Sequence, residues 1–340
     1  MRPSELADLL ERLLDGQERE GDQARLAAPM PAPPSAEALY AGAVALRRRV
    51  PDLTTLPNRT LIDLCAASPM DPSRIDLFVG AGILVAAADG TVAQHGWAPS
   101  KAGGAALVHA LGLPTQASPQ GASAALIQCG YAFLSAGAGG SSRLWALAPA
   151  SPLLAVLSPL VNPARPQCML VGVADPAWSE PLARALGMAG VDAALVVSCR
   201  GRPGLGLGAD SVGHRWSNGR LSTFHHLESG ATSDGLESGG ATVDAARIES
   251  TFDGLRGPLA DAIALNAGAA LWVAGHLPTF AEARRWARSR LSQRVDLADF
   301  ASEIEAISPT SRTSPASAST SRRSPRPPRS AGRQSRDPTG

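Results

Sequence analysis

The cysteines and histidines of this sequence are poorly spaced for a metal site. Cys65, Cys129, Cys168 and Cys199 lie far apart, and no CxxC or Cys/His spacing occurs. We therefore expect buried, reduced thiols in a cytoplasmic protein. His225-His226 are adjacent, so on a strand their side chains would point to opposite faces and could not easily share a metal. A surface loop is the favoured interpretation of this pair.

Two glycine-rich stretches have spacings that occur in phosphate-binding loops. Residues 201–208 have GxGxG spacing after a strand-like run, but no acidic residue follows at the interval that a dinucleotide loop requires. Gly137-Ala-Gly-Gly140 is an equally weak pattern. Neither stretch by itself predicts a cofactor.

The composition indicates a globular protein with a real core. The chain has 340 residues, 44% of them hydrophobic and only 4% aromatic, so the core must consist mostly of Ala, Leu and Val. Met1–Gly16 is charged and amphipathic, unlike a signal peptide. The longest apolar run, Leu153–Val173, is broken by prolines, Asn162 and Arg165, so we expect no membrane span.

The first fifty residues predict two helices. Ser4 would cap a helix that runs to Leu14, and Ser35 would cap a second helix that runs to Val50, with Glu37 in its first turn. Between them, Ala27–Pro34 is rich in proline and indicates a linker.

Short apolar strands then alternate with helices. Strands are expected at Thr60–Leu64, Thr91–Gln94, Met169–Val173 and Ala193–Ser198. Helices are expected at Val79–Ala88, Ala102–Gly112 (with Gly112 just past the helix end), Ser179–Gly187, Leu259–Val273 and Thr279–Leu291. This alternation predicts an α/β fold, in which a small N-terminal helical domain packs on a larger α/β domain with a central mixed or parallel sheet flanked by helices.

Three regions follow from this pattern. Residues 1–57 form the N-terminal helical segment and residues 58–306 the α/β domain, some of whose helices could join the helical part. Residues 307–340 form a tail rich in Ser, Pro and Arg. From Ser308 onward the tail holds seven Arg and one acidic residue, Asp337, a local excess of +6 in a chain whose net charge is +1. We expect the tail to be disordered, because it can bury little apolar surface. Its arginines could contact nucleic acid or an acidic partner, although solvated disorder is the favoured interpretation.

Three segments, in order, resemble the anthranilate phosphoribosyltransferase family of the nucleoside-phosphorylase-like glycosyltransferase group. Val92-Ala-Gln-His-Gly96 and the following Ser100–Gly112 are similar to the family's Lys-His-Gly-Asn stretch and its Ser-Lys-Ser-Gly-Ser-Ala-Asp loop. Leu157-Ser-Pro-Leu-Val-Asn-Pro-Ala-Arg-Pro166 is similar to the Leu-Gly-Pro-Leu-Thr-Asn-Pro-Ala-Arg signature. Asp261-Ala-Ile-Ala-Leu-Asn-Ala-Gly-Ala-Ala-Leu271 resembles the Leu-Asn-Ala-Ala-Ala helix.

The resemblance implies a reaction and its partners. Family members transfer phosphoribose from phosphoribosyl pyrophosphate (PRPP) to anthranilate in the tryptophan pathway, with Mg²⁺, in a hinged cleft and usually as homodimers. Retained positions imply PRPP or phosphate binding by Ser100, Lys101, Gly103 and Gly104, where Lys101 is the one lysine of the sequence. Substrate-side candidates are His95, Gly96 and, more loosely, Arg143. Each of these residues also has a purely structural interpretation. Lys101 could be an ordinary solvated lysine, and His95 could pack in the core or hinge. Asn162–Arg165 could form a structural turn whose arginine hydrogen-bonds neighbouring carbonyls.

Other family positions have changed. The family's Gly-Thr-Gly-Gly-Asp-Gly phosphate loop is replaced by Ala66-Ala-Ser-Pro-Met-Asp71, which has no glycine. Its Asn-Ile-Ser-Thr element matches Leu77-Phe-Val-Gly80, and its metal-binding Asp-Glu pair matches Gly206 and Leu207. Neither of these two residues offers Mg²⁺ a side-chain oxygen, so the expected metal ligands are lost. Two interpretations stay open: a divergent enzyme that works through Ser100–Gly104, and a non-catalytic homologue that binds or interacts, with nucleic acid as one possible partner of its tail.

Overall fold

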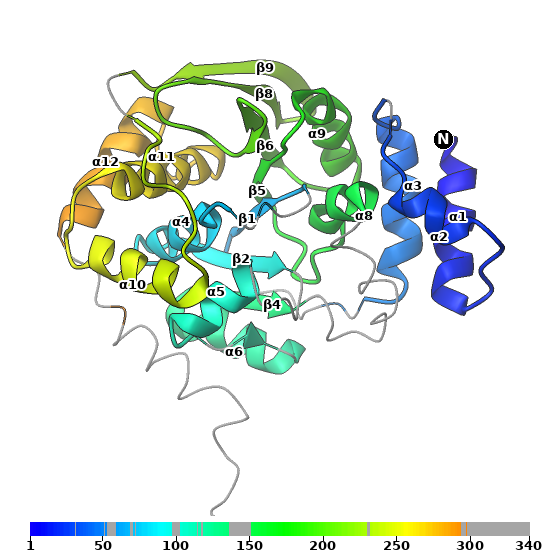
Figure 1. Ribbon diagram of the computed structural model, residues 1–340, viewed down its shortest axis with the longest axis horizontal. Coiled ribbons are helices and arrows are strands. Elements are labelled where there is room, and N and C mark those ends of the chain that lie inside the picture. The colour runs from blue at the N-terminus through cyan, green and yellow to red at the C-terminus, as the bar shows by residue number, and fades with distance from the viewer. Residues whose placement is uncertain are drawn as a thin grey trace, which may run out of the picture.

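A computed structural model describes most of the chain. The described residues are 1–30, 32–50, 52, 59–68, 71, 73–96, 103–113, 115–116, 118–135, 151–229, 232–293 and 297. Within them, a group of N-terminal helices packs beside a larger α/β unit built on one sheet (Figure 1). The expected fold class is confirmed, whereas the residue boundaries proposed for the domains remain predictions.

The central sheet is mixed. Its strand order is β3-β4-β2-β1-β5-β6-β8-β9, and β7 also pairs with β6. The strands are β1 (Leu61–Ala66), β2 (Thr91–Gly96), β3 (Thr115–Gln116), β4 (Tyr131–Ser135), β5 (Cys168–Gly172), β6 (Ala193–Cys199), β7 (Arg202–Pro203), β8 (Asp210–Ser217) and β9 (Arg220–Leu227). Pairing is parallel from β3 through β6, and antiparallel where β6 meets β7 and β8 and where β8 meets β9.

The parallel strands are buried on both faces. Every residue of β5 and β6 is buried, which explains their nearly continuous apolar sequences. Side chains alternate between two cores: Leu170 joins the cluster on one face of the sheet, while Met169 and Val171 join the cluster on the other. Strand β8 instead mixes exposed and buried positions, and β9 alternates between exposed and partly buried ones, as an antiparallel ribbon with one solvated face does.

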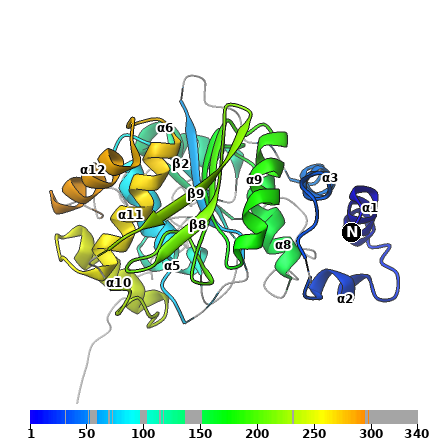
Figure 2. The same ribbon diagram turned by 90° about the horizontal axis from the view of Figure 1, so that it is seen from above.

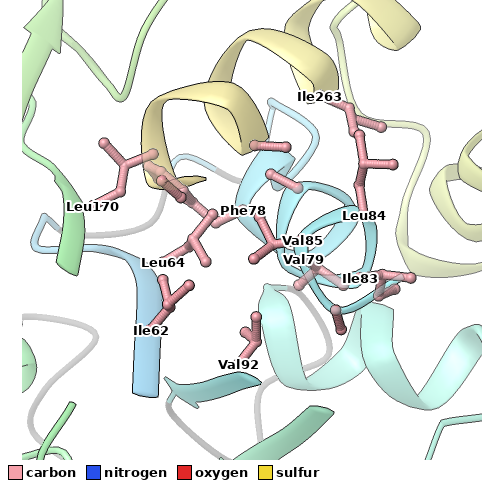
Figure 3. Close-up of a cluster of buried hydrophobic side chains, with 14 of the residues drawn as sticks. Ile62, Leu64, Phe78, Val79, Ile83, Leu84, Val85, Val92, Leu170 and Ile263 are labelled. Atoms are coloured by element: carbon pink, nitrogen blue, oxygen red, sulfur yellow. The ribbon is translucent and has the colours of Figure 1, made fainter. Parts of the chain in front are cut away.

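Helices cover both faces of the sheet (Figure 2). The helices are α1 (Pro3–Asp15), α2 (Asp22–Ala27), α3 (Ala36–Arg47), α4 (Leu77–Ala86), α5 (Gly104–Ala110), α6 (Pro119–Cys129), α8 (Pro152–Leu157), α9 (Ser179–Met188), α10 (Ala241–Phe252), α11 (Pro258–Val273) and α12 (Phe280–Ser292), with short 3₁₀ turns η3 (Ser158–Val161) and η4 (Pro176–Trp178). On one face α4 and α11 pack side by side against the sheet, and α11 also contacts α12. Figure 3 shows this core, where Phe78 and Ile83 of α4 share a cluster with Leu64 and Ile263.

The N-terminal helices cover the other face through α3. Helix α1 buries four leucines, at positions 6, 9, 10 and 13, and α3 carries this layer onto α9 and η3. Ser35 caps α3 as expected, since its hydroxyl accepts a hydrogen bond from the Ala38 N–H at 3.3 Å. The expected Ser4 cap is wrong: α1 begins at Pro3, two residues earlier than that cap implies, and the Glu5 carboxylate accepts from the Arg2 N–H at 2.9 Å instead.

Several elements differ from the sequence expectations. The histidine pair does not lie in a loop: His225 and His226 are on β9, where they point to opposite sides and bond Asp210 and Glu228, respectively.

Other features agree with the sequence expectations. Gly112 has a left-handed backbone (φ 72°) past the end of α5, as expected. All four cysteines are buried. Among the described helices, none has the length and hydrophobicity to cross a bilayer.

Candidate functional site

A cavity of about 500 Å³ opens where the parallel strands end. Ala66 ends β1, Ala174 lies just after β5, and Cys199 ends β6. The first turns of α4 and α5 form one wall, and two loops, 200–209 and 232–240, complete it. Ligands of open α/β sheets bind at this carboxyl edge, so the cavity is the candidate functional site.

The floor of the cavity is apolar. Phe78 is 5% exposed, and its ring lies so close to Gly172 and Gly204 that a Cβ on either glycine would stand 2.7 or 3.0 Å from the Phe78 Cζ atom. The floor is completed by further aliphatic side chains, among them Ile75, Leu77, Leu205, Leu207 and Leu236. The first turn of α4 therefore presents a hydrocarbon surface to a ligand.

Asp76 caps the N-terminus of helix α4, which lies at this floor. Its carboxylate accepts a hydrogen bond from the Phe78 N–H at 3.0 Å, and burial raises the pKa of Asp76 above its ordinary value. A free helix N-terminus is a ready anion site, because its N–H groups lack partners. Here a carboxylate already occupies that position, so α4 is poorly suited to bind a phosphate.

Two of the other aspartates that line the cavity also have partners in the protein. The Asp71 carboxylate accepts from the Ser73 hydroxyl at 2.6 Å, and this bond, with the Ser73 N–H and nearby arginines, lowers the pKa of Asp71. Asp244 accepts from the Ser238 hydroxyl at 2.5 Å. Asp234 is exposed on the loop. The acidic side chains are thus spread around the wall.

The arginines of the cavity come from two segments. Arg74 donates to the Glu237 carboxylate at 3.1 Å, which ties the loop after β1 to the 232–240 loop. The Ile75 N–H also donates to the Leu236 carbonyl at 3.2 Å, so this loop lies firmly along one wall. Arg200 and Arg202 are exposed and follow directly after β6.

The two family positions expected to bind magnesium have no side-chain oxygen in this chain. Gly206 and Leu207 line the cavity, and neither has a side-chain oxygen. No group of three or more His, Cys, Asp or Glu side chains that could hold a metal ion occurs in the described part of the chain. Because Mg²⁺ prefers carboxylate and other oxygen ligands in a fixed octahedral arrangement, scattered aspartates fit it poorly.

The predicted phosphate-binding residues lie partly at this cavity. Gly103 lines it and has a positive φ of 97°, immediately before α5, and Gly104 is the first residue of that helix. Gly104 lies against the Phe133 ring, where an added Cβ would stand 3.3 Å from its Cζ and Cε2 atoms. Ser100, Lys101 and Arg143 lie outside the described residues, so their roles remain predictions.

His95 and Gly96, the predicted substrate-side pair, lie at the end of β2 and are not among the residues that line the cavity. His95 is 6% exposed, its Nδ1 atom is 3.4 Å from the Ser158 hydroxyl, and burial lowers the pKa of His95 to about 4. An added Cβ on Gly96 would meet the Phe133 ring at 2.6 Å. This setting supports the packing interpretation of His95, without testing contact with a ligand.

Asn162 ties together the strands beneath the site. Its side-chain amide donates to the Asp63 carboxylate and the Ala93 carbonyl, each at 2.9 Å, while its oxygen accepts from the Ala164 N–H at 2.8 Å. Burial raises the pKa of Asp63 to about 7. Asn162 is therefore structural, as expected. The expected partner of Arg165 is wrong, because its guanidinium binds the Asp52 carboxylate at 2.7 and 2.9 Å.

Sequence reasoning missed Phe78 as a floor residue and the arginines after β6. The turn at Arg200 and Gly201 carried no such signal, because two-residue hairpin turns favour Asn-Gly, Asp-Gly or Gly-Gly. Asp76, directly before the apolar run that begins at Leu77, carried the usual signal of an N-cap.

Comparisons with known proteins agree on one family. Residues 59–293 match the model of the glycosyl transferase family, a/b domain. An anthranilate phosphoribosyltransferase of Thermus thermophilus is 33% identical over 245 residues, which are 69% of this chain and 74% of that protein. The enzyme of Desulfatibacillum aliphaticivorans is 30% identical over 274 residues, 76% of this chain and 80% of the relative.

Solved structures share the fold. The crystal structure of anthranilate phosphoribosyltransferase from Thermus thermophilus superposes with a TM-score of 0.78 at 26% identity, covering 90% of this chain and 95% of that one. The Saccharomyces cerevisiae enzyme in complex with PRPP and Mg superposes with a TM-score of 0.69 at 18% identity, covering 90% and 94%. At that identity the yeast structure supports the fold alone.

Proposed function

Because this chain belongs to the glycosyl transferase family that includes the anthranilate phosphoribosyltransferases, we propose that its cavity is a ligand site which no longer holds the Mg²⁺ complex of PRPP. In this proposal the protein is anthranilate phosphoribosyltransferase-like in architecture and does not transfer phosphoribose to anthranilate at a rate typical of enzymes.

The observation that carries the proposal is the chemistry of the cavity floor. A diphosphate needs N–H donors, cations or bound metal around it, in a site that excludes water. At the α4 wall it would instead meet the Phe78 ring and the carboxylate of Asp76. Opposite, Gly206 and Leu207 offer no metal ligand. The same positions that would stabilise a leaving pyrophosphate are therefore apolar or negatively charged.

The competing function is the family reaction itself. Gly103, which lines the cavity with a backbone conformation suited to glycine, supports this alternative, since the predicted phosphate loop 100–104 would end there. Under this alternative Lys101 would supply the positive charge. A role for the basic tail with nucleic acid likewise remains a prediction from the sequence.

Loss of anthranilate fluorescence separates the two functions. With PRPP and Mg²⁺ present and the protein at high concentration, we expect no consumption above the rate without protein. The Thermus thermophilus enzyme run under the same conditions is the positive control. Magnesium-dependent consumption that disappears in a Lys101→Ala variant would establish the family reaction and reject our proposal.

A further inference from the structure

Strand β9 forms one edge of the sheet. It spans eight residues, whereas the strand at the opposite edge, β3, spans two. Figure 1 shows β9 along the outer side of the molecule, apart from the N-terminal helices α1–α3. A long edge strand presents a row of backbone donors and acceptors to which a further strand can bind.

The turn before β9 determines which backbone groups point away from β8. Asn218 and Gly219 have φ angles of 52° and 73°, as a two-residue hairpin turn requires, and the flanking Ser217 and Arg220 are paired. That flanking pair is hydrogen-bonded, and hydrogen-bonded pairs alternate with unbonded ones along an antiparallel ribbon. The N–H and C=O groups that point outward therefore belong to four residues at alternate positions: Leu221, Thr223, His225 and Leu227.

These outward groups have no partner in the described part of the chain. No backbone hydrogen bond joins any of the four residues to a described residue outside the β8–β9 ribbon. The Glu228 carbonyl, next in the inward series, accepts from the Gly208 N–H at 2.9 Å, which agrees with the alternation. Strand β9 contains neither proline nor lysine, and its pairing with β8 has no bulge, so the usual protections of an edge are missing from this strand.

The sequence of β9 is complementary to itself in one antiparallel register. Outward residues must face outward residues, and the register that places Phe224 opposite the partner's Phe224 also places Leu221 opposite the partner's Leu227. Leu227 is 52% exposed in the single chain, so this contact covers part of an exposed apolar side chain. On the other side of the ribbon, the exposed Arg220 stands opposite the partner's Glu228, a pair of opposite charge.

The two neighbouring registers fit less well. A shift of two residues in one direction places Leu221 opposite the partner's His225, and Arg220 opposite the partner's His226. A shift in the other direction leaves Leu221 beyond the end of the partner strand and places His225 opposite the partner's His225. Of the three registers, only the first joins apolar to apolar and basic to acidic side chains. A second copy of this chain therefore fits the edge.

We propose that β9 binds β9 of a second copy of this chain, antiparallel about a twofold axis at Phe224, so that the two sheets continue into one. About eight backbone hydrogen bonds join the two strands, two for each hydrogen-bonded pair. The interface lies apart from α1–α3, so it is separate from any contact between the N-terminal helices. This inference goes beyond the proposed function, because it concerns assembly and not the cavity.

Cysteine cross-linking of the full chain tests both the contact and its register. Thr223 is exposed and faces the partner's His225 in a hydrogen-bonded pair, whose Cα atoms lie about 5.5 Å apart, within the reach of a disulfide. The native cysteines are buried and should not compete. Under oxidation, the double variant Thr223→Cys/His225→Cys should form a covalent dimer on a non-reducing gel, and each single variant far less. No dimer of the double variant, or as much dimer from a single variant, would overturn the inference.

Two matched variants test the backbone contact without added cysteines. Because the Thr223 N–H points away from β8, Thr223→Pro removes an outward donor and leaves the pairing with β8 intact, whereas Thr223→Val keeps that donor. In sedimentation at high protein concentration, Thr223→Val should form the same largest species as the wild type. Thr223→Pro should form a species of at most about half that mass, with a melting temperature close to that of the wild type. Equal masses for the two variants would contradict the inference.

Discussion

Protonation of His95 is opposed by its surroundings. Its imidazole is buried at the end of β2, and burial lowers the pKa from 6.5 to about 4. The unfolded chain therefore binds a proton between these pH values while the folded protein does not, so this residue makes stability fall as pH falls below 6.5. Asp63 has the opposite effect on stability. Its pKa is raised to about 7, so the folded protein loses stability as pH rises toward that value.

Replacing His95 with asparagine isolates its contribution, since Asp63 is present in both proteins. Relative to the wild type, His95→Asn should gain about 2 kcal/mol in unfolding free energy when the pH is lowered from 7 to 5. Urea denaturation at the two pH values measures this difference. Ser158→Ala, which keeps the imidazole buried, should retain the wild-type pH dependence. An unchanged pH dependence in the asparagine variant would mean that His95 titrates normally.

At the level of single residues, the sequence predicted contacts between residues of one short motif. It did not predict contacts between residues that lie far apart in the sequence. The turn at Asn162 was recognised as structural from its sequence alone. The partner of Arg165 was not, because Asp52 lies 113 positions away and only the packing of the chain brings the two together. Phe78 and Arg200 line one cavity from different elements, and no local sequence pattern predicts that they meet.

Among the elements, strongly patterned ones were predicted and weakly patterned ones were not. The run Ala193–Ser198 is β-branched and buried along its whole length, so strand β6 stood out. Strands β8 and β9 mix polar and apolar residues, and their clearest signal was the Asn218-Gly219 turn, which was overlooked. Helices α6 and α10 were missed because small and polar residues dilute their helical periodicity.

Helix α12 offers a test of local stabilisation within one element. Thr279 caps it, since its hydroxyl accepts from the Glu282 N–H at 3.2 Å and also donates to the Glu282 carboxylate at 2.8 Å. We expect Thr279→Ala to lower the unfolding free energy by about 1 kcal/mol, because a helix N–H loses its partner.

A hydroxyl at the other end of the same helix is the control. Ser292 is exposed and donates to the Arg288 carbonyl, so Ser292→Ala should change the unfolding free energy by less than about 0.5 kcal/mol. Chemical denaturation of both variants gives the comparison. Equal losses at both ends would show that the cap at Thr279 contributes nothing specific.

For the molecule as a whole, the fold is that of the family, and we propose that the chemistry of the cavity has diverged. The sheet, its two helical layers and the cavity at the carboxyl edge follow the family, and the alternation of strands and helices was enough to predict that arrangement. In our proposal the cavity wall no longer suits the family's PRPP complex, since Phe78 and Asp76 line it at the start of α4. A fold is maintained by its buried residues, whereas activity depends on a few lining positions that can change without loss of the core.

Titration calorimetry with PRPP in the presence of Mg²⁺ tests this central claim most directly. Our account predicts a dissociation constant weaker than about 1 mM, with no improvement when Mg²⁺ replaces EDTA. A saturable complex in the low micromolar range that requires Mg²⁺ would contradict it, because the described wall provides neither the ligands for the metal nor free donors at α4 for the diphosphate.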